Sequence, residues 1–575
     1  MISKEEKIFQ HFKLPIEYLS EKKAIQPDLN NDLELTVTKD PSQQPIYNSL
    51  FQPKTQLGEK CIIPWSKYFT TNTLFLEESH TLYSTYDSNI DNTIIDVMID
   101  KWNTIKNHTN FLEKYNFVEW APFQFLNNSS LFMTLLSYYS ISSPILNLAF
   151  PILILIIPFF LLKIAKIPIT FNNYKNIIIK QLQNHIIGKF WKNFKTTNWN
   201  QRTYYIISIS LYFYGIYQNI LSCYKFYLNS REITQHFITI RSYLSYTIQK
   251  IDELKKKMKD FQTYHKFKHT LTHHKDILCT FYQKIKHLPT ENISPKKIAL
   301  IGYILQQFYT FYNDTQLENS FLFSFGLHGY LDTILGINRN LTNGHIHATT
   351  FIQKKYPIAD FKQIYYPALL NKNPIKNDID IKTNKIITGP NAAGKTTIIK
   401  STLLNVLFSQ QIGCGFFQAA TITPFDFIHT YINIPDTIAR DSLFQSEAKK
   451  CKEILHLIKT NKDKKHLCIF DELYSGTNPY EAISSAYSYL KYISKYNNVR
   501  FLLTTHFIKL CNLLDKHKKI NNYHMDTKII PRKKPIYTYQ LKKGISTIKG
   551  GICILKDLKY PRKILRSTER ILRSL

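Results

Sequence analysis

Arginine is scarce in this chain of 575 residues. Only 11 of its 74 basic residues are arginine, and the others are lysine. The basic residues outnumber the 42 acidic ones and give a formal net charge of +32, which is typical of proteins with an anionic partner. Arginine bonds phosphate bidentately, so proteins that recognise phosphate usually contain more of it. Two interpretations of the positive charge therefore stay open. Either the partner is a nucleic acid or a membrane, or the lysine excess reflects an AT-rich genome.

Paired cysteines are also missing. The chain has eight cysteines, and none of them stands at the short spacings of a zinc site or a disulfide framework. This pattern predicts reduced, buried thiols in a protein of a reducing compartment. The cysteines are Cys61, Cys223, Cys279, Cys414, Cys451, Cys468, Cys511 and Cys553.

Charged side chains are absent from residues 121–162. Within this run, 145–162 reads ILNLAFPILILIIPFFLL, with Asn147 as its one polar residue, and eighteen apolar residues are about the minimum for crossing a bilayer. A second uncharged run covers 203–224. We expect a membrane segment in 131–162 and, as a weaker candidate, another in 203–224. One alternative is a pair of buried core helices, and the second run, which carries Ser, Gln and Asn, could also be a soluble, tyrosine-rich helix.

Acidic residues are absent between these two runs. Segment 163–202 carries eight basic residues and no acid. If both runs crossed a membrane, this segment would lie on the far side, against the tendency of positive charge to stay in the cytosol. A re-entrant hairpin within 121–162, hinged near Pro144 or Pro151, would keep it on the near side. Both arrangements stay open.

The remaining chain divides by composition. Residues 1–120 are polar and rich in turn signals, and predict a small accessory domain whose role the sequence does not assign. The hydrophobic, membrane-associated region is 121–224. Residues 225–360 have helical periodicity and little glycine or proline, which predicts an all-α domain. Residues 361–560 alternate apolar β-runs with helices, as in an α/β domain with a mostly parallel sheet. Residues 561–575 form a basic tail.

A glycine-rich loop lies between a β-run at 385–388 and an apolar helix. Its sequence, GPNAAGKTT from Gly389, matches G-x-x-x-x-G-K-[ST] in its strand–loop–helix context. In such loops the backbone N–H groups cradle phosphates, the lysine reaches the β- and γ-phosphates, and the following hydroxyl binds Mg²⁺. We therefore expect ATP and Mg²⁺ here. The predicted nucleotide-binding residues are Gly389, Pro390, Asn391, Gly394, Lys395, Thr396 and Thr397, with Thr396 also on the metal.

Two further runs end in polar residues. LCIF leads into Asp471 and Glu472, and RFLLTT leads into His506. Downstream of the loop, Asp471 is placed to hold Mg²⁺ and Glu472 to orient or deprotonate the attacking water. His506 is placed to sense or polarise the γ-phosphate. The sequence therefore predicts ATP hydrolysis, with Glu472 and His506 as the catalytic residues.

These motifs together resemble the MutS family of DNA mismatch-repair ATPases, a branch of the ABC-type ATPases. The resemblance is specific over residues 360–560 and general over the helical region before it. The segments that carry it are Gly389-Pro390-Asn391, DELYSGTNP from Asp471, Thr504-Thr505-His506, YYPAL from Tyr365, KNDI from Lys376, Gln418-Ala419, the later Asp436, Ser442, Phe444 and Glu447, and Tyr539-x-Leu541-x-x-Gly544.

The resemblance implies a fold and a mechanism. The fold is an α/β ABC-type P-loop ATPase domain preceded by an all-α lever domain, here with one or two hydrophobic membrane segments and a small N-terminal accessory domain. Members dimerise around ATP, so that Ser442 would contact the γ-phosphate bound by the partner subunit's Lys395. Closing and opening of the dimer would move the helical levers.

The chain also departs from the family pattern. Ala392-Ala393 replaces the usual Met-Gly, Ser475 replaces a common arginine, and no Phe-x-Glu mismatch-reading wedge is found near the start. The PFF run at 158–160, the asparagine, isoleucine and lysine bias and the layout resemble most the membrane-associated MutS-like proteins of large DNA viruses. We expect a dimeric ATPase of DNA repair or recombination, with mismatch reading itself in doubt. The alternative is a membrane-anchored, ATP-driven scaffold or remodelling protein that binds no DNA.

The expected partners follow from the composition of the chain and from the family resemblance. They are a second copy of the chain, double-stranded DNA bound independently of sequence, and a membrane contacted through 131–162 and, as the second candidate, 203–224. The basic C-terminal stretch from Lys516 would contact DNA phosphates, or be a solvated tail. The expected location is a membrane, with the ATPase domain facing a reducing, cytosol-like compartment.

Overall fold

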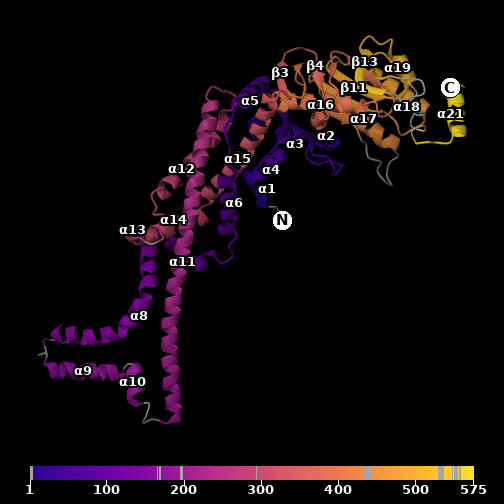
Figure 1. The fold of residues 1–575 in the computed structure, drawn as a ribbon. Coiled ribbons are helices and arrows are strands. Elements are labelled where there is room, and N and C mark those ends of the chain that lie inside the picture. Colours follow the sequence, from indigo (N-terminus) through magenta and orange to yellow (C-terminus); the bar gives the residue numbers. More distant parts are fainter. Residues whose placement is uncertain are drawn as a thin grey trace. The chain divides into compact units, whose positions relative to one another are not determined.

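A computed structural model describes residues 4–164, 166, 170–184, 186–193, 198–292, 294–432, 443–528, 536–546, 548, 555 and 558–574. The chain folds as two compact units, each built from separate stretches of sequence (Figure 1). Unit 1 contains Met1–Ile90, Ile251–His274 and Leu322–Leu575, and unit 2 contains Asp91–Lys250 and Lys275–Phe321. The described fold is mixed α/β with many helices.

The centre of unit 1 is a six-stranded sheet in the order β13-β12-β6-β11-β10-β9. All neighbouring strands in it are parallel except β12 and β13. The alternating apolar runs predicted this mostly parallel arrangement. The strands are β6 (Asn384–Thr388), β9 (Phe427–Tyr431), β10 (His466–Asp471), β11 (Val499–Thr505), β12 (Ile520–Lys528) and β13 (Ile536–Lys543).

Helices cover both faces of this sheet. Successive side chains of a strand point to opposite faces, so Ile387 joins the core around α16 while Ile386 joins the core around α17, α18 and α19. Almost every side chain of α16 is buried, because the helix is enclosed on all sides. The four helices are α16 (Lys395–Ile412), α17 (Leu443–Thr460), α18 (Pro479–Ile493) and α19 (Ile508–Leu514).

A second sheet of five strands, in the order β5-β4-β8-β3-β7, adds to the core around α16. Its strands are β3 (His347–Phe351), β4 (Ala359–Ile364), β5 (Asn377–Asp380), β7 (Cys414–Gly415) and β8 (Ala419–Ile422), and η3 (Pro367–Lys372) connects β4 to β5. Near the C-terminus, α21 (Arg562–Ser574) carries the predicted basic tail.

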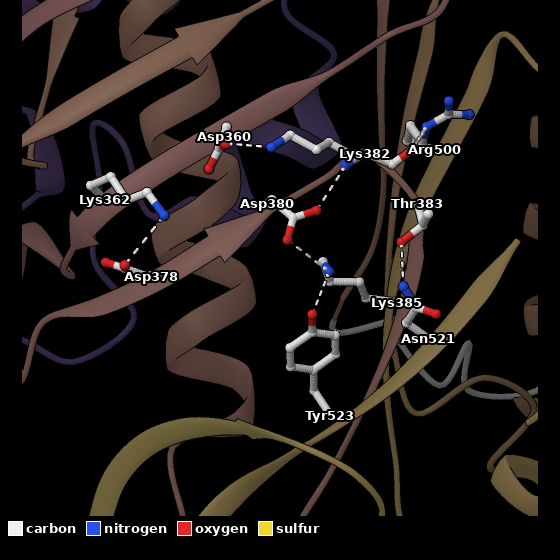
Figure 2. A network of polar contacts seen from close by, with 10 residues as sticks. All are labelled: Asp360, Lys362, Asp378, Asp380, Lys382, Thr383, Lys385, Arg500, Asn521 and Tyr523. Atoms are coloured by element: carbon white, nitrogen blue, oxygen red, sulfur yellow. Dashed lines mark hydrogen bonds and ion pairs between the residues drawn. The ribbon is translucent and has the colours of Figure 1, made fainter.

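A polar network joins β4 and β5 of this sheet to β6 and β12 of the central one (Figure 2). The ammonium of Lys385, only 1% exposed, lies 3.3 Å from Asp380 Oδ2 and donates to the Tyr523 hydroxyl at 3.0 Å. Nearby, Lys382 pairs with Asp360 at 2.7 Å, and its carbonyl accepts from Arg500 Nε. Burial raises the pKa of the Asp380 carboxyl, but the Lys385 charge outweighs it and holds the pKa below its usual value. The network fixes the strand that leads into the glycine-rich loop.

The first 90 residues share the core around α16 instead of forming a core of their own. Two buried glutamines of α16 make the connection: Gln410 Nε2 donates to the Thr70 carbonyl at 3.2 Å, and Gln411 Nε2 to the Trp65 carbonyl at 2.7 Å. The Tyr47 hydroxyl donates to Gln411 Oε1 at 3.0 Å. The sequence predicted an accessory domain over 1–120, because hydrogen bonds between residues so far apart leave no local pattern in the sequence. In the structure, residues 1–90 belong to unit 1.

These N-terminal elements are short. They are α1 (Lys4–His11), η1 (Pro15–Tyr18), β1 (Lys22–Ala24), α2 (Pro27–Leu33), α3 (Ile46–Phe51), α4 (Gln56–Trp65), β2 (Tyr68–Thr70) and α5 (Thr73–Thr85), with β1 and β2 antiparallel. The C-terminal part of α15 (Thr315–Thr342) packs against them closely. A Cβ on Gly336 would lie 1.5 Å from the Phe51 carbonyl oxygen, so only glycine fits there.

Unit 2 is helical. Its aromatic core includes Phe111 stacked on Tyr312 at 3.7 Å and Trp102 stacked on Phe321 at 5.2 Å between ring centroids. Its elements are α6 (Asn92–Lys106), α7 (Phe111–Lys114), η2 (Ala121–Asn128), α8 (Ser130–Ile164), α9 (Phe171–Asn184), α10 (Ile186–Asn193), α13 (Pro295–Ala299), α14 (Ile301–Asn313) and parts of α11 (Trp199–Lys257), α12 (His265–Ile285) and α15.

Helix α8 is a single element from Ser130 to Ile164, and Figure 1 shows it changing direction along its length. Prolines inside a helix remove a backbone hydrogen bond and bend it. Because α8 is one continuous helix from Ser130 to Ile164, the re-entrant hairpin within 121–162 is not formed. Instead, α9 lies against the end of α8, where Phe159 and Tyr174 meet edge to face at 5.9 Å.

One described helical stretch, Arg202–Lys257, is long and apolar enough to cross a membrane, by length and composition alone. It contains the predicted segment 203–224, and none of its most apolar window is buried. Ile207 is 58% exposed and Leu211 is 63% exposed. The alternative of a buried core helix is therefore wrong for this segment. Several side chains between 147 and 161 lie outside the described residues, so the segment 131–162 stays a prediction.

Candidate nucleotide site

The glycine-rich loop connects the end of β6, at Thr388, to the start of α16, at Lys395. Gly394 stands immediately before the helix with φ +92°, a left-handed conformation that side chains disfavour. Ala392 also has a positive φ of 64°, which costs an L-residue about 1 kcal/mol. The turn directs the free N–H groups at the start of α16 into the loop, where the partial positive charge of the helix terminus favours an anion.

Lys395 is buried at the base of this loop, only 6% exposed. Its ammonium donates to the Gly389 carbonyl at 3.0 Å and to the Pro390 carbonyl at 3.4 Å. Burial lowers the pKa of the Lys395 ammonium, and the carboxylates of Glu472 and Asp471 offset part of this effect. Two backbone carbonyls accept hydrogen bonds from the Lys395 ammonium. A phosphate bound in the loop would replace these neutral acceptors with a charged one.

Thr396 and Asp471 come together from different elements. The Thr396 hydroxyl, on the first turn of α16, donates to Asp471 Oδ2 at 2.9 Å, and the Thr504 hydroxyl at the end of β11 donates to Oδ1. A hydroxyl and a carboxylate are hard oxygen ligands of the kind Mg²⁺ takes. The two predicted metal ligands therefore fit that ion. Among the described residues no three His, Cys, Asp or Glu side chains form a further metal cluster.

Glu472 and His506 face Lys395 from the ends of β10 and β11. His506 Nε2 lies 2.8 Å from Glu472 Oε1 and 3.0 Å from Lys395 Nζ. The hydrogen bond from His506 lowers the pKa of the Glu472 carboxyl, and burial acts in the opposite direction. Glu472 has a φ of 54°, which turns the chain sharply after the strand. A carboxylate kept ionised beside a lysine is suited to accept a hydrogen bond from water.

The loop after Glu472 is held by a buried acid of α17. Glu447, 2% exposed, accepts hydrogen bonds from the N–H and hydroxyl of Ser475, both at 3.0 Å, and from the N–H of Gly476 at 3.1 Å. A Cβ on Gly476 would lie 2.7 Å from Leu443 Cγ, so the loop touches the first turn of α17. Ser442 lies outside the described residues.

The other predicted binding residues lie around the loop. Pro390 is buried, Asn391 is exposed, and Thr397 faces a cavity of about 380 Å³. Aromatic and apolar side chains dominate the lining of this cavity, which adjoins Gly394. Its lining includes Tyr365, Tyr366, Ile375, Met525 and Tyr539. Motif spacing alone did not predict the cavity, because strands far apart in sequence supply its walls.

The sequence of this region matches known proteins. Residues 385–575 match the family model described as MutS domain V, the ATPase-domain region of that family. Similar curated proteins include the DNA mismatch repair protein MutS of Parabacteroides distasonis, 33% identical over 209 residues, which are 35% of this chain and 23% of the relative. MutS of Bacteroides fragilis is 31% identical over 230 residues, 38% of this chain and 26% of the relative.

A eukaryotic protein matches in the same way. The DNA mismatch repair protein MSH3 of Scheffersomyces stipitis is 34% identical over 222 residues, 36% of this chain and 21% of the relative. This chain thus spans about a quarter of the length of the curated relatives it matches. From Lys385 onward, therefore, this part of the chain is similar to domain V of the MutS family.

Proposed function

We propose that this protein binds ATP with Mg²⁺, hydrolyses it, and couples the cycle to the binding of double-stranded DNA as a dimer. The observation that carries the ATPase is the convergence of the loop lysine, two acids and a histidine from the ends of neighbouring strands. The relatives' descriptions as DNA mismatch repair proteins support the DNA partner.

Each residue has a role that its surroundings suit. The N–H groups at the start of α16 and the Lys395 ammonium would bind the β- and γ-phosphates. Thr396 and Asp471 would hold Mg²⁺, which supplies charge neutralisation of the phosphate oxygens when bound. Glu472 would accept a hydrogen bond from the attacking water and orient it, and His506 would contact the γ-phosphate.

The cavity beside Gly394 would take the nucleotide's base. It adjoins the loop, its volume of about 380 Å³ suits a planar ring system, and Tyr365, Tyr366 and Tyr539 provide aromatic surface. Stacking on tyrosine discriminates weakly between purines. The base would add affinity, and the phosphate contacts would carry the specificity for a triphosphate.

The DNA and dimer parts of the proposal rest on similarity to relatives much longer than the matched region. Ser442 would reach the nucleotide bound by the partner subunit's Lys395, and the basic helix α21 offers positive charge for phosphates. The family match covers residues 385–575, the ATPase-domain region, and not a mismatch-reading domain. We therefore propose ATP-coupled, sequence-independent DNA binding without mismatch reading.

The test is ATP turnover by the purified full-length chain, alone and with perfect duplex, mismatched and branched DNA. The Glu472→Gln variant should reduce kcat by about 10²- to 10⁴-fold, the range of a lost general acid–base or water-positioning group. The matched control Glu119→Gln removes an exposed carboxylate of unit 2 and should leave kcat unchanged.

The outcomes separate the two halves of the proposal. Turnover that depends on Glu472 and rises with DNA supports both halves, and the preferred DNA names the substrate. If no DNA changes the rate of ATP turnover at low salt, the DNA role is refuted and the proposed ATPase activity is still supported. Turnover unaffected by Glu472→Gln would refute the site.

A membrane location is a second candidate, as an anchor for this ATPase or for a scaffold without DNA. Its support is the unburied apolar stretch of α11 together with segment 163–202, which has eight basic residues and no acid. Anionic lipid attracts such basic stretches next to an apolar helix. The ATPase side would then face a reducing compartment, in agreement with the free thiols of the described cysteines.

A further inference from the structure

A second concave site lies in unit 1, which we call the lysine hollow. Its volume is about 530 Å³, and its polar lining includes Lys354, Lys355, Lys465, Thr71, Thr73 and Gln353. These side chains come from three separate parts of the chain. Two of the lysines follow β3, and the third stands one residue before β10. All of these polar groups are able to donate hydrogen bonds.

The three ammonium groups have no carboxylate partner among the described residues. One acid lines the hollow, Asp426, but it is engaged elsewhere: its Oδ2 accepts the Lys465 backbone N–H at 3.0 Å, and its Oδ1 lies 3.9 Å from Lys464 Nζ. Three like charges in one hollow repel one another. An anion would relieve this repulsion beyond what Asp426, the one acid of the lining, provides.

The hollow is preformed by backbone hydrogen bonds. The N–H groups of Asp426 and Phe427 donate to the Lys465 carbonyl at 2.9 and 3.0 Å, which locks the entrance to β9 against the entrance to β10. The Ile352 N–H donates to the Ile422 carbonyl at 3.0 Å and fixes the start of the lysine pair. Ligand binding here requires only lysine side chains to move.

Its position separates it from the nucleotide site. The strands β6, β9, β10 and β11 are parallel, and the predicted catalytic groups stand at their C-terminal ends. Lys465 and Asp426 precede the N-terminal ends of β10 and β9. At about 3.3 Å per residue, the length of β10 puts Lys465 roughly 20 Å from Asp471.

We propose that the lysine hollow binds clustered phosphate groups, on a nucleic-acid backbone or on a free polyphosphate. Three ammonium groups, two hydroxyls and an amide match the many acceptor oxygens of such an anion. A lysine cluster without arginine or base-reading groups recognises charge and not sequence. The site is distinct from the proposed ATP site and does not depend on hydrolysis.

The test compares full-length wild type with the triple variant Lys354→Glu/Lys355→Glu/Lys465→Glu. The control Lys13→Glu/Lys39→Glu/Lys54→Glu reverses the same charge at exposed lysines elsewhere in unit 1. The probes are a fluorescent 30-base-pair duplex, measured at several salt concentrations, and tripolyphosphate, measured calorimetrically with the nucleotide site saturated by Mg·ADP. ATP turnover without DNA serves as the check of folding.

We expect the hollow variant to lose DNA affinity by roughly tenfold or more at 0.1 M salt, with a salt slope shallower by about 2 to 3, because each phosphate contact contributes about 0.9. Loss of tripolyphosphate binding alone would assign the site to a free polyphosphate. Equal behaviour of the hollow and control variants with both probes would overturn the proposal. If turnover shows misfolding, the milder Lys→Gln triple gives the same comparison.

Discussion

His506 Nε2 has two neighbours and one hydrogen-bonding position. If Nε2 carries a proton it donates to Glu472, and if it carries a lone pair it accepts from Lys395. It cannot do both at once. A γ-phosphate that drew the Lys395 ammonium toward itself would leave Glu472 as the one partner of Nε2.

This arrangement predicts a pH effect. The His506 hydrogen bond lowers the pKa of Glu472, so the carboxylate stays ionised to lower pH than an ordinary glutamate. In His506→Asn the pKa of Glu472 should rise, and the acid limb of the kcat–pH profile should move to higher pH. A variant with reduced kcat but an unchanged acid limb would contradict this. His265→Asn, an exposed histidine of α12, is the matched control.

The sequence predicted these residues because each belongs to a compact motif. Lys395, Asp471, Glu472 and His506 are brought together as expected, since the C-terminal ends of neighbouring parallel strands meet at one edge of a sheet. Lys385 was not singled out as a buried cation, because the aspartate and tyrosine that bind it lie on other strands. Pairings of that kind become visible only in three dimensions.

At the scale of elements, α17 is coupled to the loop that follows Glu472. Three donors of residues 475 and 476 converge on Glu447, and Gly476 is too close to Leu443 for any side chain. The first turn of α17 begins directly after Ser442, the residue expected to reach the partner subunit's nucleotide. A change at that end of α17 would therefore be passed to the loop that follows Glu472.

Glu447→Ala should separate these two elements. It leaves three donors without their buried charged acceptor, which should cost about 2 to 3 kcal/mol of unfolding free energy, and ATP turnover should fall with it. Chemical denaturation and steady-state turnover measure the two effects. Glu453→Ala, at an exposed glutamate of the same helix with 68% exposure, should change neither. An unchanged free energy of unfolding in Glu447→Ala would show that water replaces the carboxylate.

The sequence predicted whether a segment is a helix or a strand better than it predicted which elements pair or pack together. The mostly parallel sheet follows from short apolar runs alternating with helices, and the described β-pairings agree. The five-stranded second sheet was not predicted, because its strands are only two to six residues long. The cavity beside Gly394 was missed because strands far apart in sequence supply its walls.

At the scale of the molecule, the unburied apolar surface of α11 is the feature that a soluble ATPase does not need. Large exposed apolar surfaces mark contacts with a membrane or a protein. We expect full-length protein to float with vesicles containing anionic lipid. Ile207→Asn/Leu211→Asn/Tyr214→Asn should reduce the bound fraction severalfold, since these side chains are 58–63% exposed.

The control variant also loses three exposed apolar side chains, but these lie in unit 1 and not on α11. Val37→Asn/Ile63→Asn/Leu74→Asn alters three exposed apolar residues of unit 1 and should bind vesicles like wild type. If wild type stays with the soluble fraction at every lipid composition, the membrane location is refuted. The apolar surface would then call for a protein partner.

The division into units could not have been read from the sequence. Composition changes near residues 120, 224 and 360 suggested consecutive domains, whereas the compact units are assembled from separated stretches. Contacts such as Gln410 with Thr70 join residues 340 positions apart. No local pattern records which distant segment completes a core, so boundaries drawn from composition describe regions of similar chemistry and not folding units.

The interleaved core of unit 1 has a consequence during synthesis. The first 90 residues leave the ribosome long before α16, around which they pack, because about 320 residues separate their end from the end of that helix. At roughly 5 to 20 residues per second, the delay is about 15 to 65 s. Throughout it, the apolar side chains that will face α16 have no partner. Slow translation between residues 90 and 412 would lengthen this interval, and with it the time in which the exposed apolar side chains can aggregate.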